Sequence, residues 1–418
     1  MITLRSYQKD ISTKACALLQ QYKIAYLSMQ VRTGKTLTSL HAVEQYGAKQ
    51  ILFLTKKKAI RSIEKDYQHL APRFHIDIIN YERLHHVKAD IYDFIICDEA
   101  HVLGQFPQAS NRTIQLKLIA KDKPIIFLSG TPSPESYSQL YHQFWVSSYS
   151  PFAAYSNFYS WAKEFVRKKK KYFYNREVVD YSDAYVDEIH LLAGHLFISY
   201  SQAEAGFIQD VQEQVLQVPM KRNTYRLADI LTKERIYVSE NGEEIIADTE
   251  LKLMQKLHQL YSGTVIVDNK AAAIQIDNSK ALFIKHYFEG KKIAIFYKFR
   301  AEQQILTQVF DNTITTDPDE FNHSTDKIFI SQIQSGREGI NLSTADALVM
   351  FNIDFSSLSY QQARARIQCK DRTEPCLLYW VFAENGIEEK IYKVVMNKQD
   401  YTLKYFKKDF ATFRSVKL

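Results

Sequence analysis

The first third of the chain alternates short apolar runs with segments whose apolar residues recur at helical spacing. Continuous apolar runs of this length are typical of strands buried on both faces of a parallel sheet. The predicted strands are residues 24–30, 50–55, 75–79, 92–97 and 124–128. Helical spacing follows the first two of them, at 36–48 and 59–70. This alternation predicts an α/β lobe with a mostly parallel sheet over residues 1–138.

The pattern changes near residue 139 and again near residue 279. Over residues 139–278 the alternation disappears and aromatic-rich segments with helical spacing dominate, so we predict a helical, basic insertion or linker. Alternation resumes over residues 279–418, with apolar runs at 292–297, 326–330, 347–351 and 376–382. We therefore expect an α/β fold of two parallel-sheet lobes with a helical insertion between them and a helical C-terminal tail.

Composition narrows the classes of function. Hydrophobic residues make up 46% of the 418 residues, which is enough for ordinary cores, and no apolar run approaches membrane-spanning length. We therefore expect a globular, cytoplasmic protein with no membrane partner. Its four cysteines are scattered without metal-ligand spacing, which suits a reducing compartment. A net charge of +7 favours a polyanionic partner.

One short segment has the pattern of a phosphate-binding loop. Residues 29–36 read Met-Gln-Val-Arg-Thr-Gly-Lys-Thr and connect the first predicted strand to the first predicted helix. Backbone N–H groups at Thr33 and Gly34 would surround phosphates in front of the helix dipole. Lys35 would reach the β- and γ-phosphates, and the Thr36 hydroxyl would bind Mg²⁺. Taken alone, the same residues could be a helix N-terminus with a solvated lysine.

An acidic pair follows a buried strand in the same lobe. Asp98 and Glu99 come directly after the apolar run at 92–97, and open α/β sheets bind ligands at the carboxyl ends of their strands. Asp98 would hold Mg²⁺ through water, and Glu99 would orient and deprotonate the attacking water. The pair therefore favours a phosphoryl-transfer site for ATP and Mg²⁺. Gln8, before a predicted helix, could present its amide to adenine or could be polar surface.

The second predicted lobe has no phosphate loop of its own. A two-lobed enzyme with one nucleotide site must then supply groups to it from the other lobe. Gln362 and Arg366 lie on a predicted helix at 359–368, after a predicted strand. Arg366 could act as an arginine finger on the γ-phosphate. In isolation it could equally be an exposed helix arginine.

Two basic segments are candidates for contact with a phosphate backbone. Residues 167–171 read Arg-Lys-Lys-Lys-Lys and are followed by the aromatic run 172–174. Cations beside stacking rings suit nucleic acid, so Lys169 and Lys170 are predicted contacts, against the alternative of a solvated basic loop. Lys56 opens a lysine triplet after a predicted strand, which could meet phosphates or be a solvated turn.

Taken together, these motifs resemble those of superfamily-two helicases and translocases, in particular the Swi/Snf-like branch and its compact bacteriophage versions. Residues 98–101 read Asp-Glu-Ala-His, a DEAH box. The matching positions are Gln8, 34–36, 98–101, 129–131, 335–342, Gln362 and Arg366. The resemblance implies two RecA-like lobes and ATP hydrolysis that drives movement along nucleic acid. It assigns Gly339 to the nucleotide, and it assigns to nucleic acid Asn80, Tyr81, Arg337 and Asn341.

Three positions depart from the family pattern. Met29 replaces a small residue, Arg32 replaces a glycine of the phosphate loop, and Cys369 replaces the second arginine of the sixth motif. The large accessory insertions of remodelling enzymes are not present in this sequence, which argues against a nucleosome substrate.

These observations predict an ATP-dependent DNA helicase or translocase that acts on duplex or single-stranded DNA in the replication or recombination of a phage or similar element. The alternatives are an RNA helicase and a nucleic-acid-binding clamp with weak ATPase activity. The sequence is compatible with a monomer.

Overall fold

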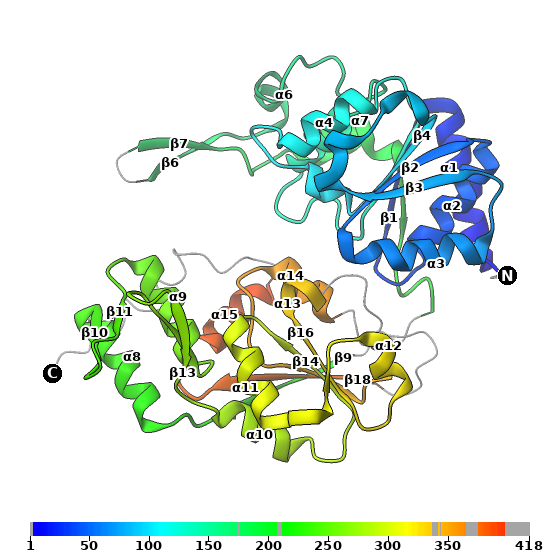
Figure 1. Ribbon diagram of the computed structural model, residues 1–418. Coiled ribbons are helices and arrows are strands. Elements are labelled where there is room, and N and C mark those ends of the chain that lie inside the picture. The colour runs from blue at the N-terminus through cyan, green and yellow to red at the C-terminus, as the bar shows by residue number, and fades with distance from the viewer. Residues whose placement is uncertain are drawn as a thin grey trace. The chain divides into compact units, whose positions relative to one another are not determined.

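The computed structural model describes residues 3–173, 176–206, 211–336, 342, 344–364 and 375–397. The chain divides into two compact units, Met1–Phe207 (unit 1) and Ile208–Leu418 (unit 2). Each unit is built around one six-stranded sheet with helices packed against it (Figure 1). The predicted α/β fold with two parallel-sheet lobes is therefore confirmed.

Unit 1 contains a sheet in which every neighbouring pair of strands is parallel, in the order β3-β2-β4-β5-β1-β8. Its strands are β1 (Ile24–Met29), β2 (Gln50–Thr55), β3 (His75–Asn80), β4 (Phe94–Asp98), β5 (Ile125–Leu128) and β8 (Phe197–Tyr200). Its helices are α1 (Ser6–Tyr22), α2 (Lys35–Tyr46), α3 (Ile60–Leu70), α4 (Asn111–Ile119), α5 (Gln139–Trp145), α6 (Phe158–Phe165) and α7 (Val186–Ala193). A hairpin of β6 (Lys169–Phe173) and β7 (Arg176–Asp180) is also part of the unit.

Helices cover both faces of this sheet. In β2, Ile51 and Phe53 join the core beneath α1, α2 and α3, while Leu52 and Leu54 join the core beneath α4 to α7. Successive side chains of a strand point to opposite faces, so a run that is apolar at every position buries both. This is why the sequence of unit 1 shows continuous apolar runs instead of alternating ones.

Unit 2 repeats this plan with the strand order β15-β16-β14-β17-β18-β9, again with parallel neighbours throughout. Its sheet strands are β9 (Val211–Val218), β14 (Ile293–Tyr297), β15 (Ile314–Thr315), β16 (Ile328–Gln332), β17 (Ala347–Met350) and β18 (Cys376–Ala383). Two hairpins are formed by β10 (Ile236–Val238) with β11 (Glu244–Ile246), and β12 (Thr264–Val267) with β13 (Ala272–Gln275). The helices are α8 (Arg222–Glu234), α9 (Glu250–Leu260), α10 (Ser279–Tyr287), α11 (Arg300–Phe310), α12 (Pro318–His323), α13 (Ile333–Gly336), α14 (Ser357–Arg364) and α15 (Glu388–Val395).

The range 139–278 differs from the helical insertion that the sequence predicts. It contributes β8 to the sheet of unit 1 and β9 to the sheet of unit 2, and it holds three hairpins besides its helices. The division between units falls at Phe207 and Ile208, not at residues 138 and 278. The physical reason lies in β9, an edge strand whose sequence Val-Gln-Glu-Gln-Val-Leu-Gln-Val mixes buried and exposed positions and so lacks a continuous apolar run.

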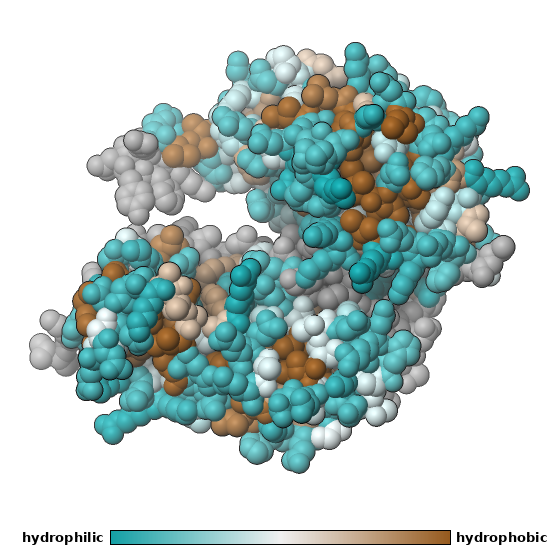
Figure 2. All heavy atoms as spheres, viewed as in Figure 1, coloured by the Kyte–Doolittle hydropathy of each residue, from teal (hydrophilic) through white to brown (hydrophobic). Residues whose placement is uncertain are grey.

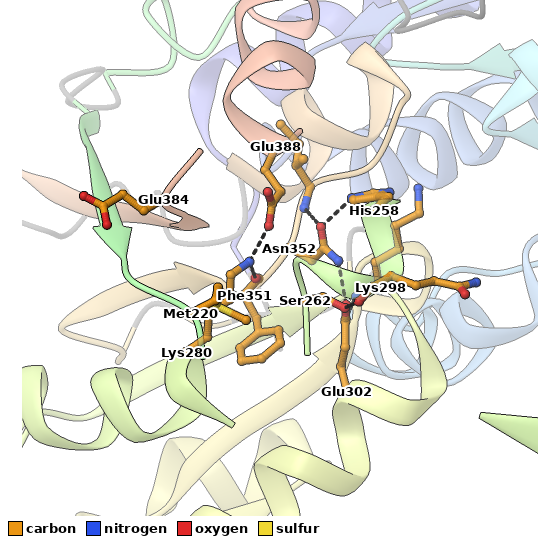
Figure 3. A network of polar contacts seen from close by, with 12 residues as sticks. Met220, His258, Ser262, Lys280, Lys298, Glu302, Phe351, Asn352, Glu384 and Glu388 are labelled. Atoms are coloured by element: carbon orange, nitrogen blue, oxygen red, sulfur yellow. Dashed lines mark hydrogen bonds and ion pairs between the residues drawn. The ribbon is translucent and has the colours of Figure 1, made fainter. Parts of the chain in front are cut away.

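A network of buried polar groups fixes the interior of unit 2 (Figure 3). The Lys280 ammonium donates to Glu388 Oε1 at 2.5 Å and to the Phe351 carbonyl at 3.4 Å. The side chains of Lys280 and Glu388 are 1% and 0% exposed, so each charge is shielded from water and is neutralised by the other. The pair joins α10 to the first turn of α15, where the helix dipole also favours a carboxylate.

Asn352 lies at the centre of the second half of this network. Its amide donates to Glu302 Oε1 at 2.5 Å, and its carbonyl oxygen lies 2.6 Å from His258 Nε2. Burial, together with the nearby Lys298 charge, lowers the pKa of His258, so the ring is neutral and donates from Nε2 to Asn352. These bonds connect α9, α11 and the residues after β17.

Within the described part of the chain, no helix has both the length and the apolar character needed to cross a bilayer.

The buried pair predicts a large loss of stability in Glu388→Gln. The variant leaves the Lys280 ammonium buried without a counter-ion, and removing one partner of a buried ion pair costs about 3 kcal/mol or more. Urea unfolding should show this loss, whereas Asp248→Asn, which breaks an exposed pair with Lys252, should cost no more than about 0.5 kcal/mol. Equal costs for the two variants would contradict this account of the core.

Candidate nucleotide-binding site

The predicted phosphate loop lies between β1 and α2, as the sequence indicates. Gly34 precedes the helix with a φ of 81°, and a Cβ at this position would lie 2.1 Å from Gln8 Nε2, so only glycine fits. Lys35 begins α2, and its ammonium donates to the Met29 carbonyl at 3.0 Å. The N–H groups of the first turn of α2 have no partner within the helix, and they lie at the same loop as the lysine. N–H groups and a lysine at one helix N-terminus are the arrangement that binds phosphate.

The backbone conformation at Arg32 shows how the loop accommodates this departure from the family pattern. Its φ of 64° lies in the left-handed region, where glycine is favoured. The loop therefore keeps the backbone conformation that a glycine would adopt, with an arginine side chain attached to it.

Gln8 packs over this loop from the start of α1. It is 5% exposed, its Oε1 accepts from the Arg5 backbone N–H at 2.9 Å, and its Nε2 faces Gly34. The neighbouring Tyr7 donates from its hydroxyl to the Thr33 carbonyl at 3.0 Å. Gln8 is therefore a buried residue beside the loop and not part of the solvated surface.

Two residues that sequence reasoning missed hold the other side of the loop. Gln202 donates from Nε2 to the Val31 carbonyl at 3.0 Å and from its backbone N–H to Gln30 Oε1 at 2.8 Å. The ring of Tyr200 stacks on Tyr7 with 4.6 Å between centroids. Both residues belong to the end of β8 and the turn after it, in the range predicted as an insertion, and the short strand is the signal that could have found them.

Asp98 ends β4 and is held from two neighbouring elements. Thr55, at the end of the adjacent strand β2, donates to Asp98 Oδ2 at 2.8 Å. The Tyr81 hydroxyl donates to the Asp98 backbone carbonyl at 2.7 Å. Tyr81 is only 2% exposed, so in this structure its hydroxyl serves the acidic pair and not the surface that the resemblance assigns to it.

Glu99 is connected through a histidine to Ser129, in the family-matching range 129–131. His101 Nδ1 lies 3.3 Å from Glu99 Oε2 and 3.2 Å from Ser129 Oγ. Ser129 Oγ also accepts the backbone N–H of Thr131 at 3.1 Å. The loop after β5 and the acidic pair after β4 thus form one continuous chain of contacts.

The two carboxylates have opposite electrostatics. Burial, together with the charge of Glu99, raises the pKa of Asp98 above its ordinary value. Burial alone would also raise the pKa of Glu99, but the hydrogen bond and charge of His101 and the charges of Lys35 and Lys56 outweigh it and lower that pKa. The charge of Lys35 acts to lower the pKa of both carboxylates.

The structure thus brings together most of the predicted nucleotide residues on unit 1: Gln8, Thr33, Gly34, Lys35, Asp98 and Glu99. Thr36 follows Lys35 in the first turn of α2. Gly339 and Arg366 lie outside the described residues, as do Arg337 and Asn341, and Gln362 is described only as part of the backbone of α14.

Candidate nucleic-acid residues of unit 1 lie at two places. Lys56 follows β2 and Asn80 ends β3, at the same edge of the sheet as Asp98. Lys169 and Lys170 lie on β6, where they form ion pairs of 2.8 Å with Asp183 and Glu177 respectively.

The comparison with protein families decides the class of the chain. A model described as the SNF2-related domain matches residues 24–267. The chain belongs to this SNF2-related family. The matched range contains the phosphate loop and the acidic pair, and it confirms the resemblance to the Swi/Snf-like branch of superfamily two. Membership of the family supports the interpretation of the chain as a nucleic-acid-dependent ATPase.

Individual relatives of this SNF2-related chain are distant. A "DNA repair and recombination protein RAD54-like" of Drosophila erecta is 24% identical over 408 residues, which cover 82% of this chain and 50% of the relative. An "Uncharacterized ATP-dependent helicase MG018" of Mycoplasma genitalium is 27% identical over 187 residues, which cover 40% and 18%. The chain thus spans half the length of the Drosophila relative. A solved "Sulfolobus solfataricus SWI2/SNF2 ATPase core domain" is 14% identical with a TM-score of 0.42, over 95% of this chain and 89% of that one.

The raised pKa of Asp98 predicts that Asp98→Asn stabilises unit 1 at pH 8. An acid whose pKa is higher in the folded state costs stability when ionised, and this cost grows as pH rises from the unfolded value of about 3.9. The neutral amide removes it, so urea unfolding should show a gain of about 1–3 kcal/mol at pH 8 that vanishes below pH ~4. A variant that is less stable than the wild type at pH 8 would contradict this assignment.

Proposed function

We propose that the chain is an ATP-dependent DNA translocase or helicase, a compact DEAH-box protein of the kind carried by bacteriophages. The observation that carries the proposal is the half-buried pair Asp98 and Glu99, whose pKa values the Lys35 charge acts to lower, at a phosphate loop within the SNF2-related range. The names of the relatives mention DNA repair, recombination and an ATP-dependent helicase, and they support DNA as the partner and replication or recombination as the setting.

Nucleotide binding would use the loop as it stands. The N–H groups of Thr33, Gly34 and Lys35 would surround the phosphates, and the Lys35 ammonium would exchange the Met29 carbonyl for the β- and γ-phosphates. Gln8 would present its amide to adenine from its position over Gly34.

The residues present fit a magnesium ion. A hydroxyl and a carboxylate with room for water and phosphate oxygens are the ligands that Mg²⁺ prefers. Thr36 and Asp98 would hold it, and Thr55 would keep the Asp98 carboxylate oriented. When bound, the ion neutralises charge on the β- and γ-phosphates.

Glu99 would act as the general base. Its lowered pKa keeps it ionised at neutral pH, so it can accept a hydrogen bond and then a proton from the attacking water. His101 and Ser129 would hold Glu99 in position, and they would link its protonation state to the loop after β5. Arg366 of unit 2 would supply the cation that stabilises the γ-phosphate during transfer.

DNA contact would use the carboxyl edge of the unit 1 sheet, unit 2 and the β6–β7 hairpin. The hairpin extends away from the sheet of unit 1 and carries both hydrophilic and hydrophobic residues on its surface (Figures 1 and 2). Lys169 and Lys170 are more than half exposed, and exposed ion pairs are worth little. DNA phosphates could therefore replace Asp183 and Glu177 as their partners, without regard to sequence.

Steady-state ATPase assays test this function through Glu99→Gln. Loss of the general base should lower DNA-stimulated kcat by at least about 100-fold and leave ATP binding in place. Glu64→Gln, an exposed glutamate on α3, serves as the control and should match the wild type. Equal turnover in wild type and Glu99→Gln would instead favour the clamp with weak ATPase activity, and stimulation by RNA in preference to duplex or single-stranded DNA would favour the RNA helicase.

The hairpin predicts a salt-dependent loss of DNA affinity in the double variant Lys169→Ala/Lys170→Ala. Each lost phosphate contact lowers the slope of log K against log salt by about 0.9, so the slope should fall by roughly 1–2. Lys252→Ala/Lys270→Ala removes two ion-paired surface lysines of unit 2 and should leave the slope unchanged. Identical slopes for the two double variants would exclude the hairpin as a DNA contact.

A further inference from the structure

The carboxylate of Glu213 lies among three hydrogen-bond donors and one guanidinium in unit 2. Glu213 is on the edge strand β9, and its side chain is 13% exposed. The Tyr360 hydroxyl lies 2.8 and 3.1 Å from its two oxygens. Trp380 Nε1 and the Tyr392 hydroxyl donate to Oε2 at 3.0 and 3.2 Å. Arg364 Nε forms an ion pair with Oε1 at 2.8 Å.

All of these partners act as donors. An indole N–H and a guanidinium cannot accept hydrogen bonds. The two phenols remain protonated, because burial and the charge of Glu213 raise the pKa of Tyr360 and of Tyr392. A carboxylate accepts on both oxygens, whereas a glutamine at position 213 would turn an NH₂ group toward one or more of these donors. The site therefore requires an acid.

The donors come from two parts of unit 2. Tyr360 and Arg364 lie four residues apart on α14 and so share one face of that helix. Trp380 lies on β18 and Tyr392 on α15, which belong to the body of the unit. The Tyr360 ring also stacks on Trp380, with 5.5 Å between centroids. Glu213 thus ties α14 to the sheet.

The first turn of α14 is fixed separately. Ser359 donates to Asp354 Oδ2 at 2.8 Å, and Lys298 pairs with Asp354 Oδ1 at 2.6 Å. Lys298 lies beside the buried network around Asn352 (Figure 3). The contacts of Glu213 are made further along the helix, at Tyr360 and Arg364. They lie in the part of α14 that carries Gln362, and the helix ends two residues before Arg366 in the sequence.

We propose that Glu213 is a positioning residue for ATP hydrolysis: it couples β9, the first strand after the division between the units, to α14, the helix that carries Gln362. This inference rests on the proposed ATPase function. Rotation or fraying of α14 would displace the residues that follow it, and small displacements of a transition-state group cost large factors in rate. A residue with only a structural role would change stability and leave the turnover of the folded protein unaltered.

Two tyrosines that share this carboxylate provide a matched test. Tyr360→Phe and Tyr392→Phe each remove one hydroxyl from Glu213 and keep the ring, but only Tyr360 lies on α14. Turnover is measured with saturating DNA at a temperature well below the melting temperatures of both variants. Tyr360→Phe should lower kcat about tenfold, whereas the kcat of Tyr392→Phe should stay within about twofold of the wild type. Equal kcat values for the two variants, at whatever level, would overturn the proposal.

Glu213→Gln separates rate from binding. Nucleotide is proposed to bind on unit 1, so the variant should retain the wild-type Kd for a fluorescent ATP analogue while single-turnover hydrolysis slows by about tenfold or more. Hydrolysis at the wild-type rate in the folded variant would refute the positioning role. A weakened Kd in step with the rate would also count against it, because the residue would then act through global folding.

Failure of this inference can be told from failure of the proposed function. If Glu99→Gln abolishes turnover while Tyr360→Phe and Tyr392→Phe behave alike, the ATPase stands and the role of Glu213 falls. If wild-type protein shows no DNA-stimulated turnover, the proposed function itself is wrong, and with it the inference.

Discussion

The electrostatic action of one ammonium on two half-buried carboxylates is the constraint on which the rest depends. Lys35 begins α2, Asp98 and Glu99 end and follow β4, and the parallel sheet of unit 1 brings all three to its carboxyl edge. Two adjacent acids buried without a cation would be costly to ionise together. Lys35 and His101 offset that cost unequally, which leaves Glu99 ionised more readily than Asp98.

The surrounding residues then serve to keep this edge in place. Thr55 holds the carboxylate of Asp98, Tyr81 holds its backbone carbonyl, and Gln202 holds the loop in front of Lys35. In unit 2, the buried Lys280–Glu388 pair and the donors around Glu213 likewise hold helices and strands in fixed positions. In both units, charged groups withdrawn from water fix the elements that carry the proposed chemistry.

Much of this could be predicted from the sequence, for a physical reason. Strands buried on both faces produce continuous apolar runs, so β2 was predicted as residues 50–55 and is found at Gln50–Thr55. The phosphate loop is a local motif whose glycine and lysine act within a few residues of each other. Local signals of this kind survive without knowledge of the fold.

What the sequence could not give depends on distant pairing. The strand β9 mixes buried and exposed positions along an edge, and its identity is settled only by its pairing with β18. Tyr81 and Gln202 acquire their roles from contacts made 17 and 171 residues away, at the Asp98 and Val31 carbonyls. Glu213 likewise gains its meaning from Tyr360, 147 residues later.

The central proposal is that ATP hydrolysis at the site on unit 1 requires the Arg366 cation. The most direct measurement is the single-turnover hydrolysis rate of Arg366→Ala with saturating ATP and DNA. Our account predicts a rate at least about 1,000-fold below the wild type, as for other arginine fingers, with ATP affinity retained. A rate equal to that of the wild type would contradict it.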